Sequence, residues 1–243
     1  MANRRQRCRS ISLYVSMIAT IVLTVGCGGS GAPSATELAS TSSPAASPTG
    51  SGEVPRFQLG VELEPGTYQS EVFVSPLEFT VTAGWKVFED EPGQFGLALI
   101  ENDGPCVCIW RDVRVAAATV GQEEPDPAVG ATAADITAAL AGRPGIDATT
   151  PAAVTVGGLQ GYLIDLRLAA GTEGAPTVIG TQTSAGVYWG VAPGSEQRLV
   201  VLDVPADQGG GNVAINIEVC CGVTFADRTA VVDPVIASFR FLP

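Results

Sequence analysis

The residues with the clearest chemical potential in this chain are four cysteines in two close couples, Cys106 with Cys108 and Cys220 with Cys221. Four thiolates can hold Zn²⁺ or Cu(I), whereas four thiols can close two disulfides. The C-x-C and C-C spacings differ from the C-x₂-C spacing of zinc knuckles, which favours disulfides. Pairing within a couple makes a tight ring with unfavourable geometry. We therefore expect two bridges between the couples, and the metal site and free thiols stay open as alternatives.

Histidine is absent from all 243 residues, which removes the catalytic sites that depend on an imidazole. Neither a Ser-His-Asp triad nor a Cys-His nucleophile pair can form. Paired carboxylates remain as a source of glycoside hydrolysis. The candidates lie in turn-rich segments typical of a solvated surface, and they are Glu62 with Glu64, the acidic run 89–91, and Glu123 with Glu124. We predict no catalytic residue, with a carboxylate-dependent hydrolase as the alternative.

Three tryptophans are the remaining candidates for a binding site. Trp85, Trp110 and Trp189 could line a pocket for a carbohydrate or a lipid, or they could pack in the core. No motif predicts a cofactor, and no spacing of ligating residues predicts a metal site outside the cysteine alternative.

The N-terminus has the pattern of an export signal. Four arginines (Arg4, Arg5, Arg7 and Arg9) precede an apolar run of 16 residues, Ile11 to Gly26. A membrane-spanning helix needs about 20 residues, so the run is typical of a cleaved secretory leader. Ordinary secretion is preferred to a twin-arginine route because the residues after the arginine pair lack the expected apolar pair. An uncleaved anchor helix is the alternative.

The end of the leader, "LTVGC", resembles a bacterial lipobox. The resemblance implies a diacylglyceryl thioether on Cys27, cleavage before this residue, and often N-acylation. We therefore expect residues 1–26 to be a lipoprotein signal peptide, and the mature chain to sit on the extracytoplasmic face of the cell membrane.

Composition and charge define two regions after residue 26. Residues 27–53 combine Cys27 with a linker rich in Gly, Ser, Ala, Pro and Thr, and this composition predicts disorder. Residues 54–243 carry all the aromatic residues but one, as a single domain requires. The chain after the leader has 9 basic and 25 acidic residues, a net charge of −16, which argues against nucleic-acid binding.

The order of predicted elements indicates an α+β domain with a mostly antiparallel sheet covered by two helices. Residues 132–142 predict a helix that Thr132 caps and Gly142 ends. A second helix is predicted near the C-terminus, with Asp227 as its cap and Pro234 inside it as a kink or a break. Its apolar face comprises Val231, Val232, Val235, Ile236 and Phe239. Hairpins join most of the strands, and one of them turns at Gly157-Gly158.

Three stretches carry a resemblance to known proteins: "PGTYQSEVF…LEFTVTAGW", "VTVGGLQGYLIDL" and "PVIASFRF". They resemble bacterial secreted lipoproteins of unknown function and, more distantly, the Mog1/PsbP-like α+β domains of LpqN-type lipoproteins. The resemblance implies a fold and carries no active site.

These observations favour a lipid-anchored envelope protein that is not an enzyme and that binds a small ligand or a partner protein. Its membrane contact would be through the lipid. The alternatives are the carboxylate-dependent hydrolase and a copper- or zinc-binding envelope protein that uses the four cysteines.

Overall fold

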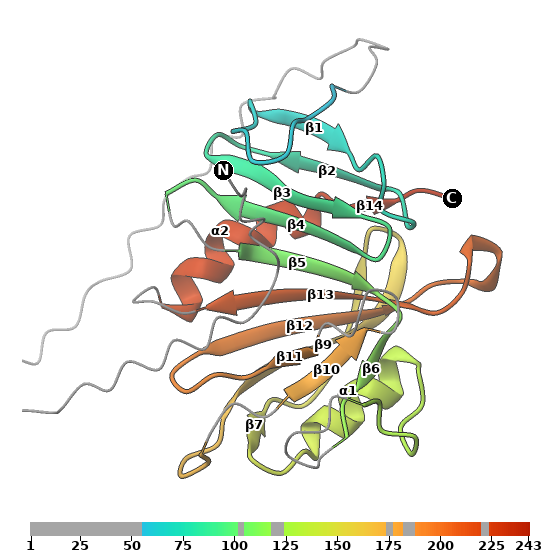
Figure 1. Cartoon of the computed structure of the whole chain (residues 1–243), viewed down its shortest axis with the longest axis vertical. Helices are drawn as coiled ribbons and strands as arrows, with labels where there is room; N and C mark the ends of the chain where they lie inside the picture. The colour runs from blue at the N-terminus through green and yellow to red at the C-terminus, as the bar shows by residue number, and fades with distance from the viewer. Residues whose placement is uncertain (1–54, 102–104, 118–123, 174–176, 182–187, 220–223) are drawn as a thin grey trace, which may run out of the picture. The chain divides into compact units, whose positions relative to one another are not determined.

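The computed structural model describes residues 55–101, 105–117, 124–173, 177–181, 188–219 and 224–243, and its strands form three sheets (Figure 1). The largest sheet has the order β3-β4-β5-β13-β12-β9-β7, and β8 also pairs with β9. Its strands are β3 (Trp85–Glu91), β4 (Gln94–Leu99), β5 (Pro105–Arg111), β7 (Ile146–Ala148), β8 (Ala152–Val156), β9 (Leu159–Leu168), β12 (Glu196–Asp203) and β13 (Asn212–Val219).

Two smaller sheets and two α-helices complete the fold. The first small sheet is β1 (Gly66–Gln69), β2 (Leu77–Val81) and β14 (Arg240–Phe241). The second is β6 (Val113–Val115), β10 (Thr177–Thr181) and β11 (Tyr188–Gly190). The helices are α1 (Ala133–Ala141) and α2 (Phe225–Ala237), and a 3₁₀ turn, η1, covers Ala206–Gln208. Every strand pairing is antiparallel, so the predicted α+β class is confirmed.

The central strands are buried on both faces, and their side chains alternate between two separate cores. Along β5, Val107 and Ile109 belong to the first core, whereas Cys108 and Trp110 belong to the second. The same alternation runs through β13, β12 and β9, because successive side chains of a strand point to opposite faces. The middle of β5, β12 and β13 therefore reads as a nearly continuous apolar run, whereas β9 carries polar side chains at Gln160, Asp165 and Arg167.

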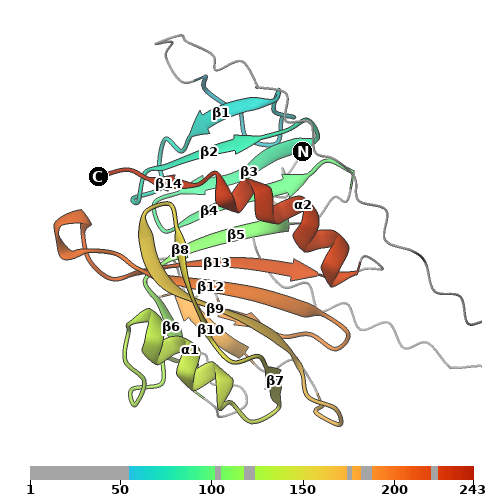
Figure 2. The same ribbon diagram turned by 180° about the vertical axis from the view of Figure 1, so that it is seen from behind.

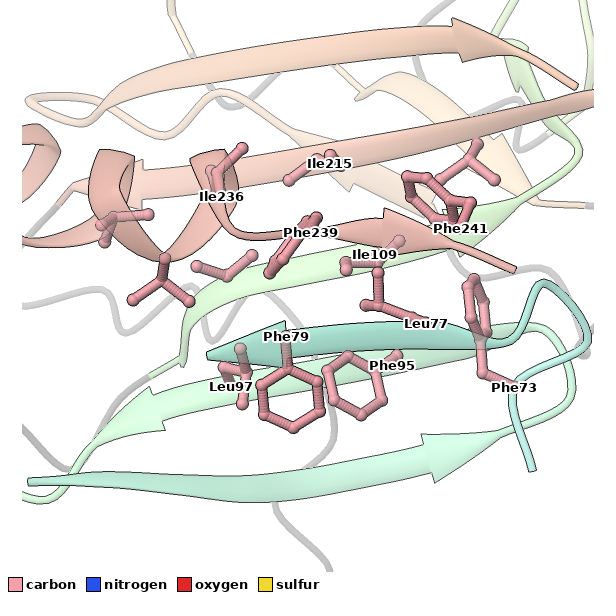
Figure 3. Packing of buried hydrophobic residues seen from close by; sticks show 14 of the residues in the cluster. Phe73, Leu77, Phe79, Phe95, Leu97, Ile109, Ile215, Ile236, Phe239 and Phe241 are labelled. Atoms are coloured by element: carbon pink, nitrogen blue, oxygen red, sulfur yellow. The ribbon is translucent and has the colours of Figure 1, made fainter. Parts of the chain in front are cut away.

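The first core lies between the central sheet, the β1-β2-β14 sheet and α2, and it is rich in aromatic rings (Figure 3). Phe79 of β2 and Phe95 of β4 meet at 5.2 Å between ring centroids, and Phe57 and Tyr68 pack against Phe79. Figure 2 shows α2 crossing in front of β4 and β5, where Val232, Val235 and Ile236 enter this core.

The second core lies between the other face of the central sheet, α1 and the β6-β10-β11 sheet. Ile136 and Leu140 of α1 are fully buried there, together with Ile179 of β10 and Trp189 of β11. Each face of the central sheet is thus covered by one helix and one small sheet, where the sequence predicted helices alone.

Helix α1 forms where the capping pattern predicted it. The Thr132 hydroxyl accepts the Asp135 N–H at 3.2 Å, and Gly142 is the C-cap residue. These local hydrogen bonds satisfy backbone groups that a helix end leaves unpaired.

Helix α2 differs from the prediction in two ways. Its N-cap is Thr224, which accepts the Asp227 N–H, so Asp227 lies in the first turn instead of capping it. Val231 is 46% exposed, whereas the other four residues of the predicted apolar face are buried, namely Val232, Val235, Ile236 and Phe239. Pro234 lies within one helix that runs to Ala237, so of the two outcomes predicted for it the break does not occur.

A glycine near the start of β9 allows β9 and β12 to approach closely. A Cβ on Gly161 would lie 2.7 Å from Leu202 Cα and would also collide with the Val201 carbonyl. We expect Gly161→Ala to lower the free energy of unfolding by about 2 to 4 kcal/mol, because backbone atoms cannot move aside cheaply. Urea denaturation measures the change, and Gly66→Ala is the control.

Gly66 begins an edge strand, and its nearest neighbour to an added Cβ is the Tyr68 ring at 3.8 Å. Its substitution should change the stability by no more than about 0.5 kcal/mol. Equal effects of the two substitutions would contradict the close approach of β9 and β12.

Candidate functional site

The strongest candidate site in the described residues is a charged groove of about 310 Å³ at the β7 end of the central sheet. It lies between β7, β9, the start of β12 and the start of α2. Its lining combines four charged side chains with one aromatic ring, and comprises Asp147, Ala148, Thr149, Asp165, Leu166, Arg167, Glu196 and Phe225. We call it the charged groove.

Strand register brings these charges together. Asp147 of β7 is opposite Arg167 of β9, which in turn is opposite Glu196 of β12. Two residues further along both strands, and therefore on the same face of the sheet, Asp165 of β9 is opposite Arg198 of β12. These charged residues lie on the face of the sheet that carries the first core. The apolar side chains of that core end before this part of β9 and β12.

A chain of ion pairs orders the groove. Arg167 donates to Asp147 Oδ2 from Nη2 at 2.6 Å and from Nε at 2.9 Å. Arg198 donates to both Asp165 oxygens, at 2.8 and 3.1 Å, and its Nη1 also lies 3.3 Å from Asp233 on α2. The Arg198 guanidinium sits 5.2 Å from the centroid of the Phe225 ring, a distance that allows a cation–π contact.

The electrostatics of both arginines follow from these contacts. The hydrogen bond that Arg198 donates to Asp165 raises the pKa of Arg198 above its usual value, while partial burial opposes the increase. The hydrogen bond that Arg167 donates to Asp147 raises the pKa of Arg167, and the charge of Glu196 contributes to the increase. Both guanidinium groups therefore stay charged and hold their carboxylates in place.

This arrangement suits recognition of a charged group better than acid–base chemistry. Asp147 and Asp165 use their oxygens to accept from guanidinium groups, which leaves them poorly placed to attack a substrate or to transfer a proton. Glu196 is exposed, and no hydrogen bond to its carboxylate is found among the described residues. Three carboxylates and one guanidinium line the groove, so its walls carry a net negative charge.

The three tryptophans do not share one pocket. Trp85 is buried in the first core, whereas Trp110 and Trp189 are buried in the second, with ring centroids 4.9 Å apart. None of the three lines the charged groove. Their indoles fill core volume in this structure, and a ligand role for them stays a prediction.

Buried polar groups surround the Trp110–Trp189 pair. Gln94 is opposite Trp110 in the β4–β5 ladder, and Asn216 is opposite Cys108 in the β5–β13 ladder. Both indole N–H groups, the Gln94 Oε1 and both amide atoms of Asn216 are buried without a hydrogen-bond partner among the described residues. This polar cluster makes the second core less uniformly apolar than the first.

The predicted cysteine couples can be followed only in part. Cys108 is buried on β5 and disulfide-bonded, and no disulfide joins two of the side chains that the structure describes. The Cys106 side chain and residues 220–223 lie outside the described part. The pairing of the four cysteines therefore stays a prediction. Cys108, as a disulfide sulfur, offers no thiolate to the four-cysteine metal site that the sequence left open.

The lipidation site Cys27 and the leader before it also lie outside the described residues. Among those residues, neither helix is long and apolar enough to cross a bilayer. The same residues contain no group of three His, Cys, Asp or Glu side chains placed to hold a metal ion.

Sequence reasoning missed the charged groove. Its signal was present in "IDLRL", where Asp165 and Arg167 alternate with apolar residues and so share one face of a strand. Their partners Asp147, Glu196 and Arg198 come from other strands, whose register depends on long-range pairing.

Comparisons with known proteins identify no family. No protein-family model matches the chain, and no curated protein matches it. Five chains of solved structures match it, among them a crystal structure from Bacteroides thetaiotaomicron VPI-5482 at 1.50 Å resolution. That protein is 12% identical with a TM-score of 0.36, and the match covers 74% of this chain and 50% of that one. The chain thus spans half the length of that protein.

Glu218, near the end of β13, is a partly buried carboxyl whose ionisation should make the stability of the fold depend on pH. Burial raises the pKa of Glu218 above its usual value of 4.5, so the folded state retains a proton that the unfolded state has lost. The free energy of unfolding should therefore fall as the pH rises from about 4.5 through the raised pKa. We expect Glu218→Gln to be more stable than the natural chain at neutral pH and to lose this advantage below about pH 4.

Urea denaturation between pH 4 and pH 8 checks this expectation, with Glu64→Gln at an exposed position as the control. Stability curves of Glu218→Gln and the natural chain that stay parallel over this range would show that Glu218 ionises normally.

Proposed function

We propose that the chain is a lipid-anchored, extracytoplasmic envelope protein without enzymatic activity, and that its domain binds a basic ligand or a basic segment of a partner protein in the charged groove. The observation that carries the proposal is the groove itself, where carboxylates held by two arginines surround an aromatic ring. The chemistry of its lining matches an ammonium or guanidinium group attached to an apolar stem.

Attachment to the membrane is supported by the sequence pattern. The basic and apolar leader, the "LTVGC" stretch that ends at Cys27 and the polar linker up to residue 53 are the arrangement of a tethered lipoprotein. A net charge of −16 would be repelled by anionic headgroups, so attachment would depend on the lipid itself. We also propose that the α+β domain is Mog1/PsbP-like, on the three stretches quoted above.

Binding rather than hydrolysis is supported by the state of the groove carboxylates. A glycosidase needs one carboxyl that retains a proton next to a second carboxylate. Asp147 and Asp165 instead each accept from a guanidinium group. No observation in the described residues favours the hydrolase or the metal-binding alternative over ligand binding.

The lipid anchor can be tested by labelling the full-length chain in a bacterial host with tritiated palmitate. We expect the natural chain to take up label and to pellet with the membranes, and Cys27→Ser to take up none, because the thioether needs the sulfur of Cys27. Cys8→Ser is the matched control, since Cys8 lies in the predicted leader and should not affect labelling. Equal labelling of Cys27→Ser would overturn the anchor.

Recognition by the charged groove can be tested by calorimetric titration with spermidine as a small cationic probe. We expect saturable binding that weakens as salt is raised, because exposed charges are screened. Glu196→Gln should weaken binding by roughly two- to fivefold, the range of an exposed ion pair. Glu64→Gln removes the same charge away from the groove and should bind like the natural chain. Equal affinities of the two variants would place cation binding elsewhere.

A further inference from the structure

The β8 strand is an exposed edge of the central sheet. It runs from Ala152 to Val156 and pairs with β9, and no second strand of the described residues pairs with it. Gly157, which follows β8, forms an isolated parallel bridge with Arg240. Ala152, Ala153 and Thr155 are exposed to solvent. Figure 2 shows the β8–β9 hairpin, whose tip approaches β14.

The hairpin turn determines which backbone groups of β8 are available. Gly157 and Gly158 have φ values of +59° and +88°, as a two-residue type I′ turn requires. In such a hairpin the flanking pair, Val156 with Leu159, is hydrogen-bonded, and hydrogen-bonded pairs then recur at every second residue. The N–H and C=O groups of Ala153 and Thr155 therefore point away from β9, and no hydrogen bond to them is found in the described part of the chain.

Edge strands of natural proteins are normally protected against pairing. Lysine, proline, a bulge or a covering loop usually serves this purpose. The sequence of β8, AAVTV, contains neither lysine nor proline, and the pairing of β8 with β9 has no register shift that would indicate a bulge. An unprotected edge with free backbone groups is the feature to which an extended peptide adds as a further strand.

A groove of about 590 Å³ runs beside this edge and could receive the side chains of such a strand. Its lining includes Ala153 and Tyr162, which are a cross-strand pair of β8 and β9, and Thr132 at the start of α1. We call it the edge groove. A strand added to β8 would place every second side chain on the face of the sheet that carries this groove.

Charge selects the kind of strand that fits. Asp203 lines the edge groove, is exposed, and accepts the Ala133 N–H at 2.8 Å through Oδ1. Among the residues that the structure describes, no basic side chain lines the groove. A second copy of this chain, whose net charge is −12, would bring more negative charge to a surface that carries Asp203, so repulsion opposes it. A lysine or arginine on the added strand would instead be attracted to Asp203.

We propose that β8 is a docking strand to which an extended, basic segment of a partner protein adds, with alternate side chains in the edge groove and a cationic one at Asp203. Main-chain hydrogen bonds to Ala153 and Thr155 would provide the affinity, and the groove would provide the selectivity. This site is separate from the charged groove, because the two share no lining residue.

The proposal is tested on the full-length chain in detergent, with the heptapeptide acetyl-VKVKVKV-amide as the probe and amide hydrogen exchange followed by NMR. We expect the peptide to slow exchange at Ala153 and Thr155 by at least about tenfold, because these amides gain partners. Exchange at Ala152 and Val154, which already pair with β9, should change little. Uniform slowing along β8, or none, would overturn the proposal.

Three comparisons separate strand addition from unspecific attraction. The same peptide with alternate N-methyl groups keeps its charge but loses backbone donors, and should not protect Ala153 or Thr155. Thr155→Pro removes the outward N–H and should abolish binding, whereas Thr155→Val keeps it and should bind normally. If Thr155→Pro does not fold, the N-methylated peptide still decides. Binding of the N-methylated peptide as tight as that of its parent would refute strand addition.

The charge requirement has its own matched pair. Asp203→Asn keeps an acceptor for the Ala133 N–H but loses the charge, and should weaken peptide binding by roughly two- to fivefold. Glu64→Gln should leave it unchanged, and so should Glu196→Gln, which lies in the other groove. Equal affinities of Asp203→Asn and Glu64→Gln would show that Asp203 does not select the partner.

Discussion

Two-sided burial of β5, β13, β12 and β9 is the constraint on which the rest of this domain depends. Each of these strands sends alternate side chains into two cores, so neither face can be left open to water. One helix cannot cover either face of a sheet this wide. The chain therefore supplies a helix and a three-stranded sheet to each face, and the connections that reach those faces determine the positions of α1 and α2.

Both candidate sites lie where this coverage ends. On the face of the first core, the apolar part stops near the start of α2, and the next two rows of β9 and β12 carry Asp165 with Arg198 and Arg167 with Glu196. Ion pairs across strands join these side chains, so the groove is charged instead of apolar. Along the same edge of β9 that pairs with β7, β8 leaves backbone groups without partners in the described residues. A domain built in this way offers binding surfaces made of rows and edges rather than of an enclosed cavity.

Several elements could be predicted because their signals are local. The Thr132 cap, the end of α1 at Gly142 and the Gly157-Gly158 turn each depend on residues a few positions apart. The misplaced cap of α2 shows the limit of such signals. Thr224 and Asp227 are both good capping residues, and the structure uses Thr224, whose hydroxyl donates to Asp227 at 2.6 Å. Val231 looked apolar enough for the core, yet the direction of α2 over the sheet leaves it exposed.

The sequence by itself determined the class of the domain, the hairpins, the first helix and an acidic surface. Strand alternation, turns and helix caps depend on residues a few positions apart, and the net charge depends on composition alone. Only the tertiary structure decided that Asp147, Arg167 and Glu196 share one row and that Trp85 is separated from Trp110 and Trp189. Strand order and register cause both outcomes. They arise from pairing between segments far apart in the chain, and a shift of one residue would send every side chain of a strand to the other face.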